Sequence, residues 1–170
     1  MYCRVIVASV FLGLAAAALC GQADDNKTDS YLGADGQLKA VLTVKDVQGG
    51  VAGFTGQLYT IQPNGDWTVQ GVIGPKVSPP SRKGNLSKEQ LADLAQSLAD
   101  EDFNGLPRQI GGPPRVNPHL YTVAFGERTV LLILPTAKPL PKPGDDKEKP
   151  APETRLGNVI RTVEKLTRAR

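Results

Sequence analysis

The sequence has few of the residues on which many enzyme and metal sites depend. Its 170 residues include two cysteines, Cys3 and Cys20, and one histidine, His119. Both cysteines lie in or beside the apolar N-terminal segment, so we expect neither a disulfide nor thiol chemistry in the mature chain. A single histidine excludes multi-histidine metal sites, and the lack of a mature cysteine excludes a Cys–His nucleophile pair. We therefore expect no bound metal and no cofactor.

Recognisable catalytic motifs are also missing. There is no Gly-Lys-Ser/Thr phosphate loop, no nucleophile elbow around a serine and no EF-hand spacing. His119 follows a proline at the predicted start of a strand, where we expect a side chain half in solvent rather than a triad member. Acidic residues gather at 100–102 and 144–153, as in solvated charge runs rather than the carboxylate pair of a glycosidase. The sequence predicts no catalytic residues and no enzyme; an enzyme of unrecognised type is the minority alternative.

Long apolar runs are confined to the N-terminus. Arg4 precedes about fifteen apolar residues at 5–19, and small residues follow before Asp24, which is the layout of a signal peptide. We predict a signal peptide over residues 1–23, with cleavage after Gly21-Gln22-Ala23 or, as a second candidate, after Cys20. Lipid attachment at Cys20 is a further alternative, disfavoured by the bulky Leu19. No later run is long enough to span a bilayer, so we expect an exported protein, periplasmic or secreted, without a stable membrane span.

A strong charge of either sign is absent as well. The formal net charge of +3 falls to +2 when Arg4 leaves with the leader. A near-neutral chain gives no reason to expect binding to nucleic acid or to an anionic membrane surface. The mature chain of about 145 residues is long enough to build its own core, and we expect one monomeric domain.

Periodicity predicts an α+β fold with an antiparallel sheet of about five strands, two helices on one face, and the order β-β-β-α-β-β-α. The strands are expected at 37–45, 54–62 and 67–74 and in a tight hairpin over 119–134 with a type II′ turn at Gly126-Glu127. A helix is expected from Ser87, capped by Ser87 and Gln90, to about Asp100. Trp67 is interpreted as a cross-strand packing residue rather than an exposed ligand contact.

Segment composition divides the chain further. Residues 24–36 are a polar, flexible lead-in, residues 37–134 form the core domain, and residues 153–170 form a C-terminal helix that packs on it. The segment 135–152 is rich in proline and charge and is expected to be a solvated linker. The proline-bearing segments at 75–85 and 107–118 are predicted to be loops.

One feature exceeds ordinary structural need. Four glycines, Gly49, Gly50, Gly53 and Gly56, fall within eight residues between two predicted strands. A hairpin needs one or two glycines, so we expect either a wide loop with bulges or a loop shaped for a partner. A nucleotide site is not indicated, because a strand follows rather than a helix.

The chain resembles the emfourin family, small protein inhibitors of thermolysin-like zinc metallopeptidases such as protealysin. The resemblance covers most of residues 38–166 and is carried by the ordered segments LTVKDVQGGVAGF, GQLYTIQPNGDWTV, LSKEQLADLAQSLADEDFNGLP, YTVAFGERTVLLIL and LGNVIRTVEKL. It implies a protein-binding module whose partner is a secreted or periplasmic metallopeptidase. Gly49, Gly50, Ala52 and Gly53 match the family's loop, and Val51 and Phe54 join them as neighbours.

Residues 49–58 contain no histidine, cysteine or carboxylate, so the loop has no strong side-chain ligand for the zinc ion of a peptidase. If it inhibits, it must occupy the cleft as an extended or kinked segment whose backbone pairs with the enzyme, while Val51 or Phe54 enters a pocket. The alternative is a cell-envelope interaction module unrelated to proteolysis, using the sheet face or the proline-rich segment. A projecting loop favours the inhibitor and a buried loop favours the alternative.

Overall fold

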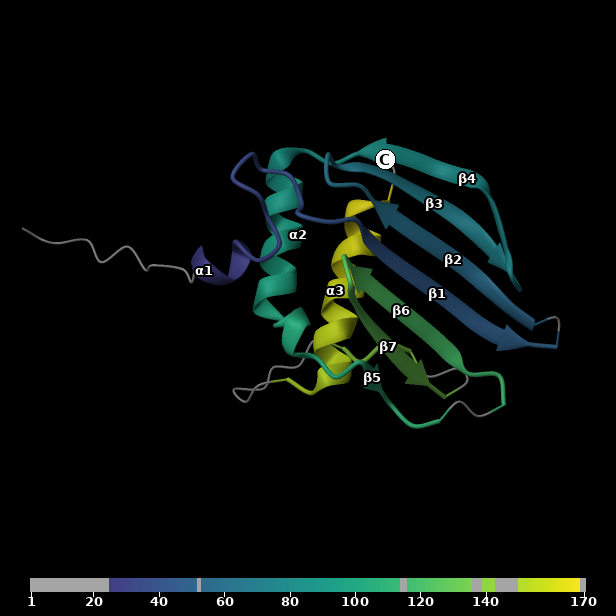
Figure 1. The fold of residues 1–170 in the computed structure, drawn as a ribbon. Helices are drawn as coiled ribbons and strands as arrows, with labels where there is room; N and C mark the ends of the chain where they lie inside the picture. The colour runs from purple at the N-terminus through teal and green to yellow at the C-terminus, as the bar shows by residue number, and fades with distance from the viewer. Residues whose placement is uncertain (1–24, 52, 114–115, 136–138, 143–149, 169–170) are drawn as a thin grey trace, which may run out of the picture.

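The computed structural model describes residues 25–168 except 52, 114–115, 136–138 and 143–149. Two long helices pack against one face of a sheet (Figure 1). The elements are α1 (Asp25–Thr28), β1 (Leu42–Gly50), β2 (Gly53–Ile61), β3 (Asp66–Ile73), β4 (Lys76–Asn85), α2 (Lys88–Asp100), the 3-10 turn η1 (Phe103–Gly105), β5 (Gln109–Ile110), β6 (His119–Phe125), β7 (Arg128–Leu134) and α3 (Pro152–Leu166). The predicted signal peptide lies outside the described residues.

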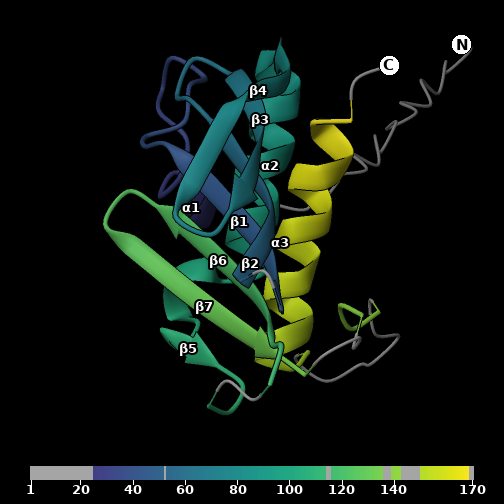
Figure 2. The same ribbon diagram turned by 90° about the vertical axis from the view of Figure 1, so that its right-hand side faces the viewer.

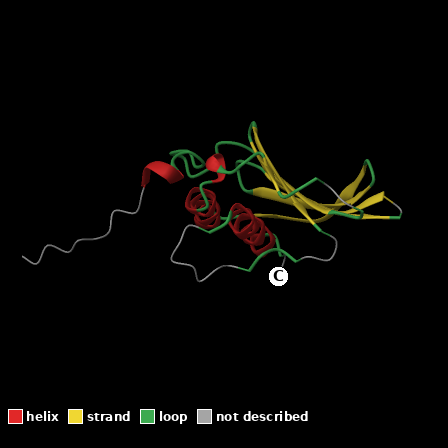
Figure 3. Ribbon diagram, turned by 90° about the horizontal axis from the view of Figure 1, so that it is seen from below, coloured by secondary structure: helices red, strands yellow, loops and turns green. Residues whose placement is uncertain are grey.

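The sheet has the strand order β4-β3-β2-β1-β6-β7-β5. All neighbours are antiparallel except β5 and β7, which are parallel. Figures 2 and 3 show α2 and α3 side by side on one face of the sheet, and Figure 1 shows that the β1–β2 and β3–β4 hairpins extend beyond the helices. The predicted α+β class is confirmed.

Two predicted loops are strands, so the sheet has seven strands rather than five. The segment assigned to a proline-bearing loop contains β4, which pairs with β3 at the sheet edge. Proline is tolerated there because an edge strand leaves one row of backbone N–H groups without a ladder partner. In the segment 107–118, Gln109 and Ile110 pair with β7 in the stretch between Pro107 and Pro113. The observed order is therefore β-β-β-β-α-β-β-β-α, preceded by the short α1.

The helix α2 forms where the local signals predict it. The Gln90 N–H donates to Ser87 Oγ (3.3 Å), and the Ser87 N–H donates to Gln90 Oε1 (2.9 Å), which completes the capping box. Its apolar stripe is buried in the main core with Leu156, Val159, Ile160 and Val163 of α3; the stripe consists of Leu91, Leu94, Ala95 and Leu98. The main core therefore lies between the helices and one face of the sheet. No helix in the described part of the chain has both the length and the apolar character needed to cross a bilayer.

The hairpin turn predicted at Gly126-Glu127 also forms. Gly126 has φ +56° and Glu127 is not among the residues with positive φ, which fits the predicted type II′ turn. Trp67 of β3 is buried, and its ring lies against Gly84, the residue opposite it on β4. The packing interpretation of Trp67 is confirmed.

The segments that flank the core are more integrated than the composition suggests. Within the predicted loose lead-in, Tyr31 is buried, contacts the ring of Phe125 and accepts a hydrogen bond from the Asn104 N–H (3.2 Å). In the described part of the proline-rich segment, Leu140 packs on the core and the Pro141 carbonyl accepts from Arg161 (2.7 Å). An apolar anchor in each segment overrides the polar composition around it.

Candidate functional site

The glycine-rich stretch forms a tight hairpin, not a wide loop. β1 and β2 pair without a register shift from Leu42 and Ile61 to Gly50 and Gly53, so that only positions 51 and 52 lie in the turn. Gly53 has φ +90°, a conformation that favours glycine. The prediction of a bulged loop is wrong because the glycines lie within the paired strands instead of interrupting the pairing.

Two of the four glycines lie at close approaches inside the sheet. A Cβ on Gly56 would lie 1.9 Å from the Asp46 carbonyl oxygen, and one on Gly49 would lie 3.1 Å from Asn117 Cα. By contrast, a Cβ on Gly50 would meet nothing closer than 3.7 Å, and one on Gly53 nothing within 4 Å. Gly49 and Gly56 therefore serve packing, whereas Gly50 and Gly53 border open space.

The predicted site residues are brought together at the free end of this hairpin. Val51 is fully exposed and Phe54 is partly exposed. Ala52 lies outside the described residues. The Gly74 N–H donates to the Phe54 carbonyl (2.7 Å), and the Gly49 N–H donates to the Pro118 carbonyl (2.8 Å). The tip, defined as Gly50, Val51, Gly53 and Phe54, is thus supported by neighbouring segments on both sides.

Further apolar side chains that the sequence did not indicate lie at the same end of the sheet. Ile73 and Val77 are exposed residues of the β3–β4 hairpin. Val116 is an exposed residue in the segment before β6. Among residues 47–58 and 70–78, Lys76 is the only charged residue. The sequence does hold a signal for this surface, because these two stretches contain one charged residue in a chain that is 22% charged. At this end, segments 47–58 and 70–78 therefore present an apolar surface with one charge, that of Lys76.

A polar row, defined as Asp46, His119 and Tyr121, lies next to the tip on the helix-facing side of the sheet. His119 Nε2 is 2.5 Å from Asp46 Oδ1, and the imidazole stacks on the Tyr121 ring at a centroid distance of 4.3 Å. The His119 side chain is one-fifth exposed at the first position of β6, more enclosed than the expected half-exposed residue. In the described part of the chain no group of three or more His, Cys, Asp or Glu side chains is arranged to hold a metal ion.

Burial is the main cause of the raised pKa values in and beside this row. Burial raises the pKa of the Tyr121 hydroxyl, and the nearby Asp46 and Glu164 carboxylates raise it further. The pKa of Glu164, on α3, is also raised, first by burial and then by Asp46, while Arg168 and Arg161 oppose the shift. These groups form a partly desolvated cluster between the sheet and α3, not a solvent-filled catalytic pocket.

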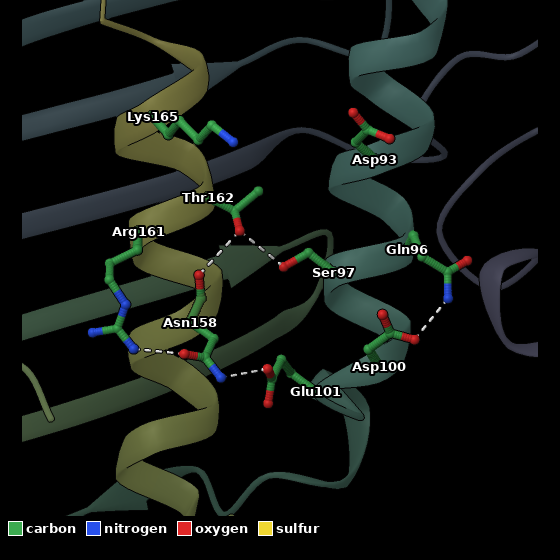
Figure 4. A pocket seen from close by; sticks show the side chains of 9 residues that line it. All are labelled: Asp93, Gln96, Ser97, Asp100, Glu101, Asn158, Arg161, Thr162 and Lys165. Atoms are coloured by element: carbon green, nitrogen blue, oxygen red, sulfur yellow. Dashed lines mark hydrogen bonds between the residues drawn. The ribbon is translucent and has the colours of Figure 1, made fainter. Parts of the chain in front are cut away.

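A separate hollow of about 460 Å³ lies between α2 and α3. Its walls are bridged by hydrogen bonds that join the two helices (Figure 4): Ser97 Oγ lies 3.1 Å from Thr162 Oγ1, and Asn158 Nδ2 donates to Glu101 Oε1 (2.6 Å). Asn158 Oδ1 also accepts from Arg161 (2.5 Å). Because these side chains are engaged with one another, the hollow is explained by helix packing.

The chain matches no known family model and no curated protein sequence. The candidate site therefore rests on the geometry of the sheet end. The tip, its two supporting segments and the low charge of segments 47–58 and 70–78 single out this surface among the described residues.

Proposed function

We propose that this chain is an exported, non-enzymatic protein-binding domain that inhibits thermolysin-like metallopeptidases through the tip of its β1–β2 hairpin. The observation that carries the proposal is the projecting tip, with Val51 fully exposed on a hairpin paired up to its last two residues. The emfourin resemblance supplies the class of partner. A preorganised tip loses little conformational entropy on binding, which favours affinity.

The hairpin geometry changes the expected mode of inhibition. β1 pairs with β2 and β6, and β2 also pairs with β3, so the strand backbones are engaged within the sheet. The tip therefore enters a cleft turn first, and strand addition through an extended segment is not the mechanism. Val51 would occupy an apolar specificity pocket, and the glycines beside it allow the enzyme to approach the backbone closely.

A titration of peptidase activity tests this function. The purified chain is added to a thermolysin-like peptidase, and stoichiometric loss of activity is expected. Val51→Asp should weaken inhibition by about 100-fold or more, because a carboxylate would have to be desolvated in an apolar pocket. Val41→Asp is the matched control, since Val41 is an exposed valine in the segment before β1, at the opposite end of the sheet.

Two results would contradict the proposal. Equal inhibition by Val51→Asp and the parent chain would remove the tip from the mechanism. No inhibition across a panel of thermolysin-like enzymes would favour the alternative, a cell-envelope interaction module with an unrelated partner.

We also propose export through the leader at residues 1–23. The support is the apolar run that follows Arg4 and ends in small residues. N-terminal sequencing of the protein from the extracytoplasmic fraction should begin at Asp24. A lipid-modified Cys20 at the N-terminus would replace this assignment with the lipoprotein alternative.

A further inference from the structure

A second apolar feature lies beside the tip. The β3–β4 hollow, lined by Gly71, Ile73, Lys76, Val77 and Ser78, has a volume of about 490 Å³. Ile73 is 67% exposed and Val77 is 49% exposed. Gly71 and Ile73 point to the same side of β3 as the buried Val69, because residues two apart share a face. Gly71 and Ile73 therefore lie on the helix-facing side of the sheet, whereas Val77 pairs with Val72 and belongs to the opposite face, so the hollow lies at the edge of the sheet around the end of the β3–β4 hairpin.

The hollow exists because the pairing of β3 with β4 is irregular at this point. The register shifts on both sides of Gln70, so that the ladder passes from Gln70 and Pro80 to Val72 and Val77. Gly71 has no side chain to fill the space that results. Ser78 Oγ accepts from the Gly71 N–H (2.9 Å) and donates to the Gly71 carbonyl (3.2 Å). Since the polar groups of Gly71 and Ser78 satisfy one another, the surface left to solvent is mainly aliphatic.

The hollow and the tip are held as one unit. Thr55 of β2 pairs with Ile73 of β3, and the Phe54 carbonyl accepts from the Gly74 N–H (2.7 Å). Phe54 therefore bridges the two hairpins. A protein surface that covers the tip would also meet the rim of the hollow, where Lys76 supplies the only charge of the two segments.

We propose that the β3–β4 hollow binds one apolar side chain of the same protein that engages the tip. This inference rests on the proposed function. The ligand is an aliphatic or aromatic side chain on the partner, flanked by a surface without charge or with a carboxylate near Lys76. A lipid surface fits less well, because segments 47–58 and 70–78 offer one cation and one aromatic, Phe54, whereas interfacial anchors combine several of both.

The test compares inhibition by three full-length chains. The double variant Ile73→Ser, Val77→Ser removes the aliphatic lining, and both sites are exposed, so the fold should be kept. Its inhibition constant against a thermolysin-like peptidase should rise by about 10- to 100-fold, the loss typical of an interface hot spot. The control Val41→Ser removes an aliphatic side chain of 37% exposure at the opposite end and should leave the constant unchanged.

Other outcomes separate the two proposals. If the parent inhibits and the double variant inhibits equally well, the hollow is not a contact, while the function of the tip stands. If the double variant loses binding to phosphatidylcholine–phosphatidylglycerol vesicles but keeps full inhibition, the hollow is a lipid contact and the inference is overturned.

A partner-free measurement decides the case in which the parent inhibits nothing. The isotope-labelled chain is titrated with N-acetyl-leucinamide while amide resonances are followed by NMR. Saturable shifts at Ile73, Val77 and Ser78 that the double variant lacks would support an apolar side-chain site. No saturable shift at these amides would refute it, independently of any peptidase.

Discussion

The side chain of Glu164 on α3 lies near Asp46 of the sheet, and its raised pKa makes the stability of the fold depend on pH. Burial and the Asp46 carboxylate disfavour the ionised form in the folded chain, so the pKa of Glu164 stands above its ordinary value of 4.5. A carboxyl group of this kind destabilises the fold as the pH rises from its unfolded pKa through its folded pKa, and the cost is fully present above both. It disappears below the ordinary value, where both states are protonated.

Glu164→Gln is therefore expected to raise the melting temperature at pH 7 and to have little effect below about pH 4. Thermal unfolding followed by circular dichroism across this pH range measures the difference. Glu127→Gln, in the exposed β6–β7 turn, is the control and should give no pH-dependent gain. A gain of the same size at both pH values would show that altered packing, not ionisation, is responsible.

The glycines of the β1–β2 hairpin differ in whether they tolerate a side chain. Gly56→Ala should destabilise the fold by about 2–4 kcal/mol, because its Cβ would lie 1.9 Å from the Asp46 carbonyl oxygen and would force the strands apart. Gly50→Ala borders open space and should change the free energy of unfolding by about 0.5 kcal/mol or less. Urea denaturation compares the two variants, and equal losses would refute the close-approach interpretation.

Local signals explain which elements the sequence could predict. The capping box of Ser87 and Gln90 acts within one helical turn, so α2 could be placed from residues 87–100 alone. β4 could not, because its two prolines oppose a strand and its pairing depends on the distant β3 edge. β1 begins at Leu42 instead of near residue 37, since Leu38 instead forms an isolated bridge with Leu32.

The candidate site likewise combines features set by local sequence with features set by contacts between distant segments. The tip residues were identified from the glycine cluster, but a single sequence did not show that the strands pair up to Gly50 and Gly53. Ile73 was missed because alternation marks it as an ordinary strand residue, and Val77 was missed because it lies in the segment predicted to be a loop. Their exposure follows from a register shift and from the extent of the helices, both of which are tertiary features.

At the scale of the whole molecule, charge and apolar surface are separated. The groove between α2 and α3 on one face of the sheet carries acidic and basic side chains, whereas segments 47–58 and 70–78 at the free end of the two hairpins hold one charge, that of Lys76. Binding through the uncharged end should be nearly independent of ionic strength, because few charge pairs exist to be screened.

The inhibition constant is accordingly expected to change by about twofold or less between about 0.05 and 0.5 M NaCl. Peptidase titrations at several salt concentrations measure this, after correction for the effect of salt on the enzyme alone. A steep weakening with salt would instead place charged elements, such as the α2–α3 groove, in the interface.

The pairing of both hairpin strands with further strands also affects how the chain would respond to cleavage by a peptidase. β1 is held by β6 as well as by β2, and β2 is held by β3. A single cut after Val51 would therefore leave both new chain ends anchored in the sheet. The nicked chain would keep its fold, and an enzyme inhibited in the proposed way would face two ends close enough for the peptide bond to be re-formed. Turnover of such a chain would be slow even when its tip is cleavable.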